Sequence, residues 1–237
     1  MTYVGVDGCR AGWFSVAIDA DGASSFALFT QFADLWNRWR AATILVDIPI
    51  GLRSGGAEQS CDIAARILLG RRRSSVFRSP CRGAIGATSH AQASERNRRA
   101  SGRGLSLQTY HILRKIEEVD SLLQSDRLAR KVVREVHPEI LFWALNGAIP
   151  MDQAKKRLAG FRERVAVLQR HFPCSEEIIA EVGREYRRYE VARDDIVDAL
   201  AAAVSGWRAN GVYSIIPKDV ETDQDGLRME MVYWQDV

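Results

Sequence analysis

Two aspartates, Asp195 and Asp198, stand three residues apart and are followed by small apolar residues at 199–203. In a helix this spacing places both carboxylates on one face, and the alanines let that face approach a neighbouring element closely. Carboxylates held together repel one another, and hard oxygen ligands are those that Mg²⁺ and Mn²⁺ prefer. The pair therefore indicates a divalent cation site. A purely structural alternative remains open, in which Asp194 is the N-cap and Asp195 stabilises the first turn of the helix.

Hydrophobic patterning predicts the elements that must position these acids. Three short strands joined by glycine turns favour an antiparallel meander, and a crossover helix then leads to a continuous apolar strand typical of a central position. A right-handed crossover makes this fourth strand parallel to the first and places it beside the first. The predicted strands are 2–7, 13–18, 25–30, 44–48, 131–137 and an edge strand at 227–234; the predicted helices are 31–40, 57–69, 89–99, 106–124, a short one after Pro138, 152–171, 175–183 and 193–208.

Asp7 and Asp47 fall at the ends of the first and fourth predicted strands. Adjacent strands lie about 4.8 Å apart, so carboxylates at matching strand ends can bridge one cation. Open α/β sheets bind ligands at this same edge. Glu135, at the end of a further strand, adds a fifth acid to Asp195 and Asp198. A site of this composition that holds two cations would serve phosphodiester cleavage, because one ion activates the attacking water and the other stabilises the leaving oxygen.

The chain has 237 residues, of which 46% are hydrophobic and 27% charged, as in ordinary soluble globular proteins. The N-terminus lacks the features of a signal peptide, and no run has the length of a membrane span, so we expect a cytoplasmic protein without membrane partners. Four cysteines without a C-x-x-C pair predict free thiols rather than a zinc site or a disulfide framework. Without repeats or long linkers, residues 1–237 are predicted to form a single α/β domain with a helical and basic insertion at 57–130.

The charge is unevenly distributed. Residues 66–103 contain ten arginines and one acid, a local balance of +9 that leaves −6 for the rest of the chain. Such a segment is typical of proteins that meet polyphosphate, and arginine suits bidentate phosphate contacts. A solvated, partly flexible basic loop is the alternative. The candidate nucleic-acid contacts are Arg71, Arg72, Arg73, Arg78 and Arg82.

Four segments, at 4–13, 46–52, 135–139 and 194–200, together resemble the uncharacterised family of predicted nucleases with a ribonuclease H fold, domain of unknown function family 429. The resemblance covers nearly the whole chain. It implies a ribonuclease H-like mixed sheet, made of an antiparallel three-strand meander plus parallel strands and flanked by helices.

Individual acids also match motifs of ribonuclease H-like proteins. The Asp-x-x-Asp-Ala-Leu run is similar to the last motif of bacterial Holliday-junction resolvases, which maps two acids onto Asp195 and Asp198. Asp7 matches the acid that opens ribonuclease H-like sites, whereas Asp47 stands where resolvases carry Glu. The resemblance implies that Asp7, Asp47, Asp195 and Asp198 hold two Mg²⁺ or Mn²⁺ ions, with Glu135 a further candidate catalytic acid.

These features together predict a metal-dependent nuclease acting on a nucleic acid of unknown type. Because the four acids would repel one another without metal, we expect Asp198→Asn to relieve strain in the metal-free protein. One alternative is a catalytically silent nucleic-acid-binding module, which metal-dependent cleavage would distinguish. Another is an actin- or sugar-kinase-like phosphotransferase, since 7–12 resembles their phosphate loop. Those proteins need two such halves, and this chain has one set of strand motifs.

Overall fold

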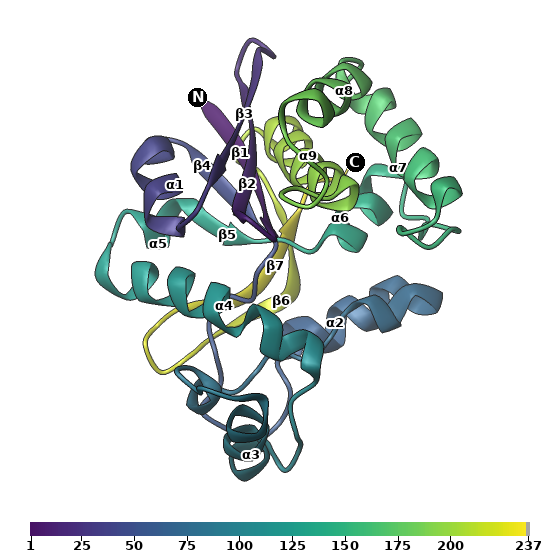
Figure 1. Cartoon of the computed structure of the whole chain (residues 1–237). Coiled ribbons are helices and arrows are strands. Elements are labelled where there is room, and N and C mark those ends of the chain that lie inside the picture. The colour runs from purple at the N-terminus through teal and green to yellow at the C-terminus, as the bar shows by residue number, and fades with distance from the viewer. Residues whose placement is uncertain (236–237) are drawn as a thin grey trace.

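A five-stranded mixed sheet carries helices on both faces in the computed structural model, which describes residues 1–235 (Figure 1). Its strand order is β3-β2-β1-β4-β5. The first three strands, β1 (Thr2–Cys9), β2 (Gly12–Asp19) and β3 (Ser24–Phe29), pair antiparallel. The other two, β4 (Thr43–Val46) and β5 (Val133–Glu135), run parallel to β1. The meander and the parallel return predicted from the sequence are therefore confirmed.

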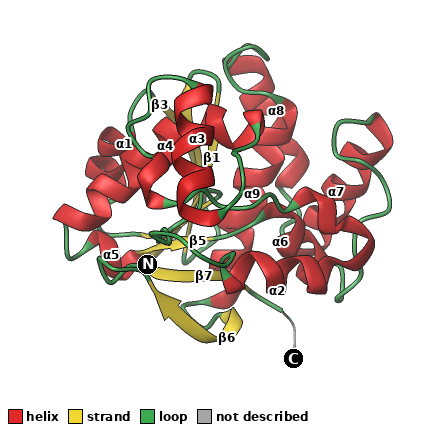
Figure 2. Ribbon diagram, turned by 90° about the horizontal axis from the view of Figure 1, so that it is seen from below, coloured by secondary structure: helices red, strands yellow, loops and turns green. Residues whose placement is uncertain are grey.

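One face of the sheet is covered by α9 (Arg193–Ala209), and α6 (Pro138–Leu145), α7 (Leu158–His171) and α8 (Ser175–Glu185) pack around α9 in the same core. Figure 2 shows α6 to α9 gathered on one side of the molecule. Leu45 of β4 lies in the core on this face, among many residues of α9. Of these helices, α9 has the closest association with the central strand, which decides where its aspartates lie.

The opposite face packs on α1 (Phe32–Trp39) and α4 (Leu107–Ser125). Val4 and Val6 of β1 point to this side, since side chains alternate along a strand. The segment between β4 and β5 also contains α2 (Ser60–Leu69), two short 3₁₀ helices at Gly70–Ser75 and Arg82–Ala84, α3 (His90–Ser101) and α5 (Ala129–Val132).

The contact between α9 and β1 depends on glycine and alanine. A Cβ atom at Gly5 would lie 2.0 Å from the Ala199 carbonyl oxygen and 2.3 Å from the Ala203 nitrogen. These neighbours are backbone atoms of α9, so the helix backbone rests directly on the strand at this glycine. The close approach predicted for the alanine-rich segment is confirmed.

The C-terminal part of the described chain forms a separate antiparallel pair, β6 (Ser214–Thr222) and β7 (Arg228–Tyr233). The sequence analysis missed β6, whose charged second half does not alternate. The prediction of an alternating edge strand at 227–234 was wrong in its pattern, because five of the six β7 residues are buried. Contacts with α2, α6 and α9 account for this burial of both faces of β7.

Two predicted boundaries also differ. The helix predicted over 152–171 begins only at Leu158, and the preceding six residues form a loop. The strand predicted over 131–137 is reduced to β5, because the short helix α5 occupies 129–132. All four cysteines are free thiols, as predicted. No helix within residues 1–235 is long and apolar enough to cross a membrane.

Candidate active site

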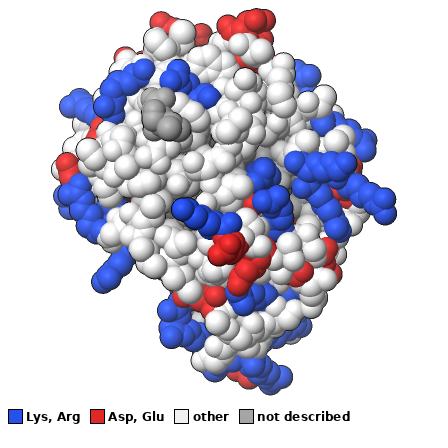
Figure 3. All heavy atoms as spheres, turned by 180° about the vertical axis from the view of Figure 1, so that it is seen from behind, with Lys and Arg blue, Asp and Glu red and all other residues white. Residues whose placement is uncertain are grey.

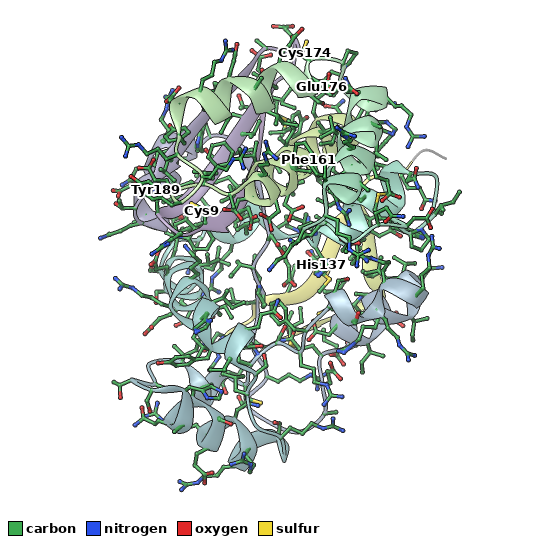
Figure 4. All side chains as sticks on the ribbon, turned by 45° about the vertical axis from the view of Figure 1, so that its right-hand side comes forward. Cys9, His137, Phe161, Cys174, Glu176 and Tyr189 are labelled. Carbon is green, nitrogen blue, oxygen red and sulfur yellow. The ribbon has the colours of Figure 1, made fainter. Side chains whose placement is uncertain are left out.

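Three elements bring four aspartates to one edge of the sheet. Asp7 is buried near the end of β1, and Asp47 directly follows β4. Both face α9, because Gly5 lies against α9 and Leu45 contacts Gly206, and side chains two residues apart in a strand share a face. Figure 4 shows Cys9 at the end of β1 and His137 at the start of α6, which border this edge.

The other two acids come from the first two turns of α9. Asp198 is buried, with 2% of its surface exposed, and Asp195 is half-buried. Both act electrostatically on Asp7 and on Asp47. The convergence of Asp7, Asp47, Asp195 and Asp198 expected from the strand ends and the helix face is therefore present.

The pKa values of all four carboxyl groups lie above their ordinary range. Burial is the largest cause in each case. Repulsion within the cluster adds to it for Asp7, Asp47 and Asp195, and repulsion from Asp194 adds to it for Asp198. The pKa of Asp47 rises to about 7 and that of Asp195 to about 6. The pKa of Asp7 rises well above its usual value, because the group is buried and because Asp47, Asp198 and Asp195 all repel its charged form. Carboxyl groups in this state gain stability from any positive charge placed among them.

Lys155 supplies such a charge. Its Nζ donates a hydrogen bond to Asp198 Oδ2 at 2.7 Å. Burial disfavours the ammonium form, but the attraction of Asp198 and Asp7 outweighs burial and raises the pKa of Lys155 above its usual value. This ion pair stabilises the charged form of Asp198. Asp198→Asn would remove the ion pair together with the repelling charge, so repulsion alone does not predict that the substitution relieves strain.

The sequence analysis missed Lys155 because it placed the residue inside a helix. The structure places it in the loop before α7, which turns back toward the acids. Gly160 permits this path, since a Cβ there would lie 2.1 Å from the Ala154 carbonyl oxygen. Glu163 accepts hydrogen bonds from the backbone nitrogens of Asp152 and Gln153, at 2.7 and 2.9 Å. The glycine at position 160, inside the predicted helix, was the signal in the sequence that could have indicated this loop.

A second lysine reaches the site from α4 and was also missed. The Lys115 side chain passes against Gly8, where a Cβ would lie 2.7 Å from Lys115 Cδ. Its Nζ donates to the Gly12 carbonyl oxygen and lies 4.6 Å from the centre of the Trp13 ring. Burial lowers the pKa of Lys115, while the nearby Asp7 is among the groups that oppose this lowering.

Asp195 combines a structural role with its place in the cluster. The backbone nitrogen of Ala192 donates to Asp195 Oδ2 at 2.8 Å, which is the bond that an acid at the third helical position makes to its N-cap residue. The N-cap is Ala192 rather than Asp194, because α9 begins at Arg193. Asp195 thus stabilises the first turn of the helix, as the purely structural alternative predicted, whereas Asp198 makes no such capping bond.

Glu135 does not join the four aspartates. The parallel pairing of β4 and β5 sets Glu135 level with Val46, whose side chain packs in the core on the face opposite α9. Its carboxylate accepts a 2.6 Å hydrogen bond from the Ile50 nitrogen, and burial raises its pKa well above the ordinary value. Repulsion from Asp62 and from Asp47 also raises this pKa. Glu135 therefore supports the segment that follows Asp47, and it lines a small hollow together with Asp47 and His137. Its role as a catalytic acid stays a prediction.

His137 and Glu139 border the site without joining the acid cluster. Burial lowers the pKa of His137 to about 4, and its buried Nδ1 has no hydrogen-bond partner. Glu139 is buried and forms ion pairs with Arg72 and with Arg164, which is itself almost fully buried. This network, which links the first 3₁₀ helix to α6 and α7, was not predicted from the sequence.

The five candidate phosphate-contacting arginines differ in their surroundings. Arg82 is 15% exposed and pairs with Asp120, Asp223 and Asp225, so its charge is compensated within the protein. Arg72 is held by Glu139. The other three are more exposed: Arg71 pairs with Asp152, Arg78 pairs with Glu58, and Arg73 forms no ion pair with residues 1–235. On the face drawn in Figure 3, Lys and Arg side chains lie in several separate groups.

The donor chemistry of the cluster fits Mg²⁺ or Mn²⁺, which prefer carboxylate oxygens. The buried Oδ1 of Asp198 has no hydrogen-bond partner, so one donor is available. Within residues 1–235, however, no three His, Cys, Asp or Glu side chains stand close enough together to form a ready-made metal site. Ion binding would therefore require side-chain rearrangement, with the Lys155 ammonium giving up its contact with Asp198.

The molecule is thus a mixed α/β protein with an acidic cluster at one edge of its sheet. A family model described as a protein of unknown function (DUF429) matches residues 5–222. Because the match spans most of the chain, the chain belongs to this uncharacterised family, and the resemblance to family 429 is confirmed. Comparisons with curated proteins and with solved structures gave no match.

The cluster predicts how the stability of the metal-free protein depends on pH. Because the pKa of Asp47 rises from 3.8 to about 7 on folding, the folded state binds more protons than the unfolded state between these pH values. The contribution of Asp47 to stability therefore falls as the pH rises from about 4 to about 7. We expect Asp47→Asn to match the wild-type melting temperature near pH 4 in EDTA and to exceed it at pH 7.5. A difference that does not grow with pH would contradict this.

Proposed function

We propose that this protein is a metal-dependent nuclease that hydrolyses phosphodiester bonds of a nucleic acid. The observation that carries the proposal is the convergence of Asp7, Asp47, Asp195 and Asp198 from two strand ends and one helix onto a single sheet edge. Uncompensated carboxylates in such a place are costly, and divalent cations are the usual means of keeping them there. We further propose that the fold is ribonuclease H-like, which the order β3-β2-β1-β4-β5 supports.

In this proposal each residue has a distinct task. Asp7 and Asp47 would lie beside the bound ions, and Asp195 and Asp198 would supply the further ligands that the second ion needs. Ions bound there would activate a water molecule and stabilise the leaving oxygen of the scissile phosphate. Lys155 compensates the charge of Asp198 until ions bind, and the bond from Ala192 to Asp195 caps the first turn of α9.

A screen of nucleic acids tests the proposal. Single-stranded, duplex, hybrid and branched DNA and RNA would be incubated with the purified protein in Mg²⁺, in Mn²⁺ and in EDTA. We expect cleavage of at least one substrate with metal and none with EDTA. Binding of Mn²⁺ would be measured separately by calorimetry. No cleavage of any substrate, together with no Mn²⁺ binding below millimolar concentration, would contradict the proposal.

A catalytically silent nucleic-acid-binding module is the second candidate. The ion pair between Lys155 and Asp198 favours it, because a fixed ammonium can compensate the cluster without metal. In that case the protein would bind nucleic acid equally well in EDTA and would cut nothing.

Arg71, Arg73 and Arg78 are the basic side chains best placed to contact phosphate, because they are exposed, whereas the side chains of Arg72 and Arg82 are largely buried in their ion pairs. Replacing these three with glutamine should weaken nucleic-acid binding. It should also flatten the dependence of log K on log salt by about 0.9 per lost phosphate contact on duplex DNA. The salt titration would be repeated with Arg127→Gln, outside the basic segment, as the control. An unchanged slope in the triple variant would show that these arginines do not contact the polymer.

A further inference from the structure

A cavity of about 760 Å³ lies within the insertion, between the start of α2, the end of α3 and the N-terminus of α4. In Figure 1 these three helices occupy the lower end of the molecule, away from α8 and α9. Cavities of this size are typical of small-molecule sites, which combine apolar walls with a few polar groups. Neither the acid cluster nor the comparisons account for it.

The lining of this cavity is positively charged overall. Arg53, Arg78 and Arg103 line it, and Glu58 is the single acidic residue among its lining residues. Arg78 pairs with Glu58, and Arg53 pairs with Glu221 outside the cavity, although the buried Nε of Arg53 has no partner. Arg103 is exposed and forms no ion pair with residues 1–235. An anion entering the cavity would therefore meet an uncompensated guanidinium, and phosphate is the anion that arginine binds best.

The same cavity offers an aromatic surface beside this charge. Phe77 is half-buried and contributes to the wall, together with the apolar Pro80 and Leu105. A planar ring can stack on such a side chain, and this stacking accepts any nucleobase because every base has a flat face. A ligand with both a phosphate and a flat ring would use both features of the wall.

The cavity also borders the acid cluster. Phe77 and Ser79 line it and at the same time line a smaller hollow next to Asp47 and His137. Ser79 is fixed there, because its backbone nitrogen donates to Asp62 at 2.8 Å. A polymer with one unit in the cavity would therefore lie close to Asp47, which lines the adjoining hollow.

We propose that this cavity binds one unpaired nucleotide of the substrate, with its base against Phe77 and its phosphate on Arg103. The choice of a nucleotide rests on the proposed nuclease function, whereas the charge and shape of the cavity do not. A paired base cannot stack on a protein side chain without leaving its duplex. The preferred substrate is therefore single-stranded or carries an unpaired end or loop next to the scissile phosphate.

Calorimetry in EDTA tests this binding without any metal-dependent chemistry. The probes are AMP and UMP, with adenosine, uridine and inorganic phosphate for comparison. The variants are Arg103→Gln and Phe77→Leu, and the control is Arg99→Gln, an exposed arginine of α3 that does not line the cavity. Melting temperatures close to that of the wild type would show that each variant is folded.

We expect the nucleotides to bind more tightly than either the nucleosides or phosphate. Arg103→Gln should weaken nucleotide binding about tenfold and leave nucleoside binding unchanged, and Phe77→Leu should weaken both about tenfold. Absence of saturable nucleotide binding at millimolar concentration would overturn the proposal, as would equal effects of Arg99→Gln and Arg103→Gln. Nucleotide binding without cleavage of any polymer would contradict the nuclease and leave the cavity assignment intact. Cleavage without nucleotide binding would do the reverse.

Discussion

Asp7→Asn is expected to reduce metal-dependent cleavage at least about 10³-fold while nucleic-acid binding stays unchanged or becomes tighter. Asp7 is the buried acid of the central strand, and the other three aspartates all act on it. The substitution removes one negative charge that would hold the ions in the transition state, and a loss of about 4 kcal/mol corresponds to a thousandfold slower reaction. Binding is spared because the removed charge repels phosphate.

The measurement compares single-turnover cleavage with binding of the same oligonucleotide in EDTA. Asp21→Asn serves as the matched control, since Asp21 is an exposed aspartate in the turn between β2 and β3 of the same sheet. It should cleave at the wild-type rate. If Asp7→Asn retains more than about a tenth of the activity, Asp7 is not a ligand of the reacting ions. If it loses binding as well, the loss of activity reports on the fold instead.

Gly5→Ala is expected to destabilise the fold by about 3 kcal/mol, at the upper end of the usual cost of overpacking a core. The added Cβ would lie 2.0 Å from the Ala199 carbonyl oxygen, and no side-chain rotation can relieve a clash with the helix backbone. The helix α9 must then move away from β1 and carry Asp195 and Asp198 with it. Cleavage should therefore fall together with stability.

Urea unfolding followed by circular dichroism would measure this loss, and the melting temperature should fall by roughly 10 °C. Gly183→Ala is the matched control, because Gly183 lies exposed in α8 and a Cβ there meets nothing within 4 Å. That variant should gain up to about 1 kcal/mol, as alanine favours a helix more than glycine does. A Gly5→Ala protein within 1 kcal/mol of the wild type would show that α9 does not rest on β1 so closely.

Much of the sheet could be predicted because its signals are local. Alternating and continuous apolar runs, glycine turns and the handedness of the crossover indicated the meander and the parallel return of β4. The small residues after Asp198 likewise predicted that α9 would lie close to the sheet. The second half of β6 escaped prediction since its charged residues do not carry the alternation that identifies a strand.

The residues themselves determined the four aspartates of the candidate site and the alanine face that brings α9 onto β1. Only the tertiary structure decided which other charges belong with them. Lys155 joins the acids because its loop turns back at Gly160, and Glu135 accepts a hydrogen bond from the Ile50 nitrogen because the register of β5 sets it level with Val46. Such contacts join residues far apart in sequence, and no local periodicity encodes the direction of a loop or the register of a parallel strand pair.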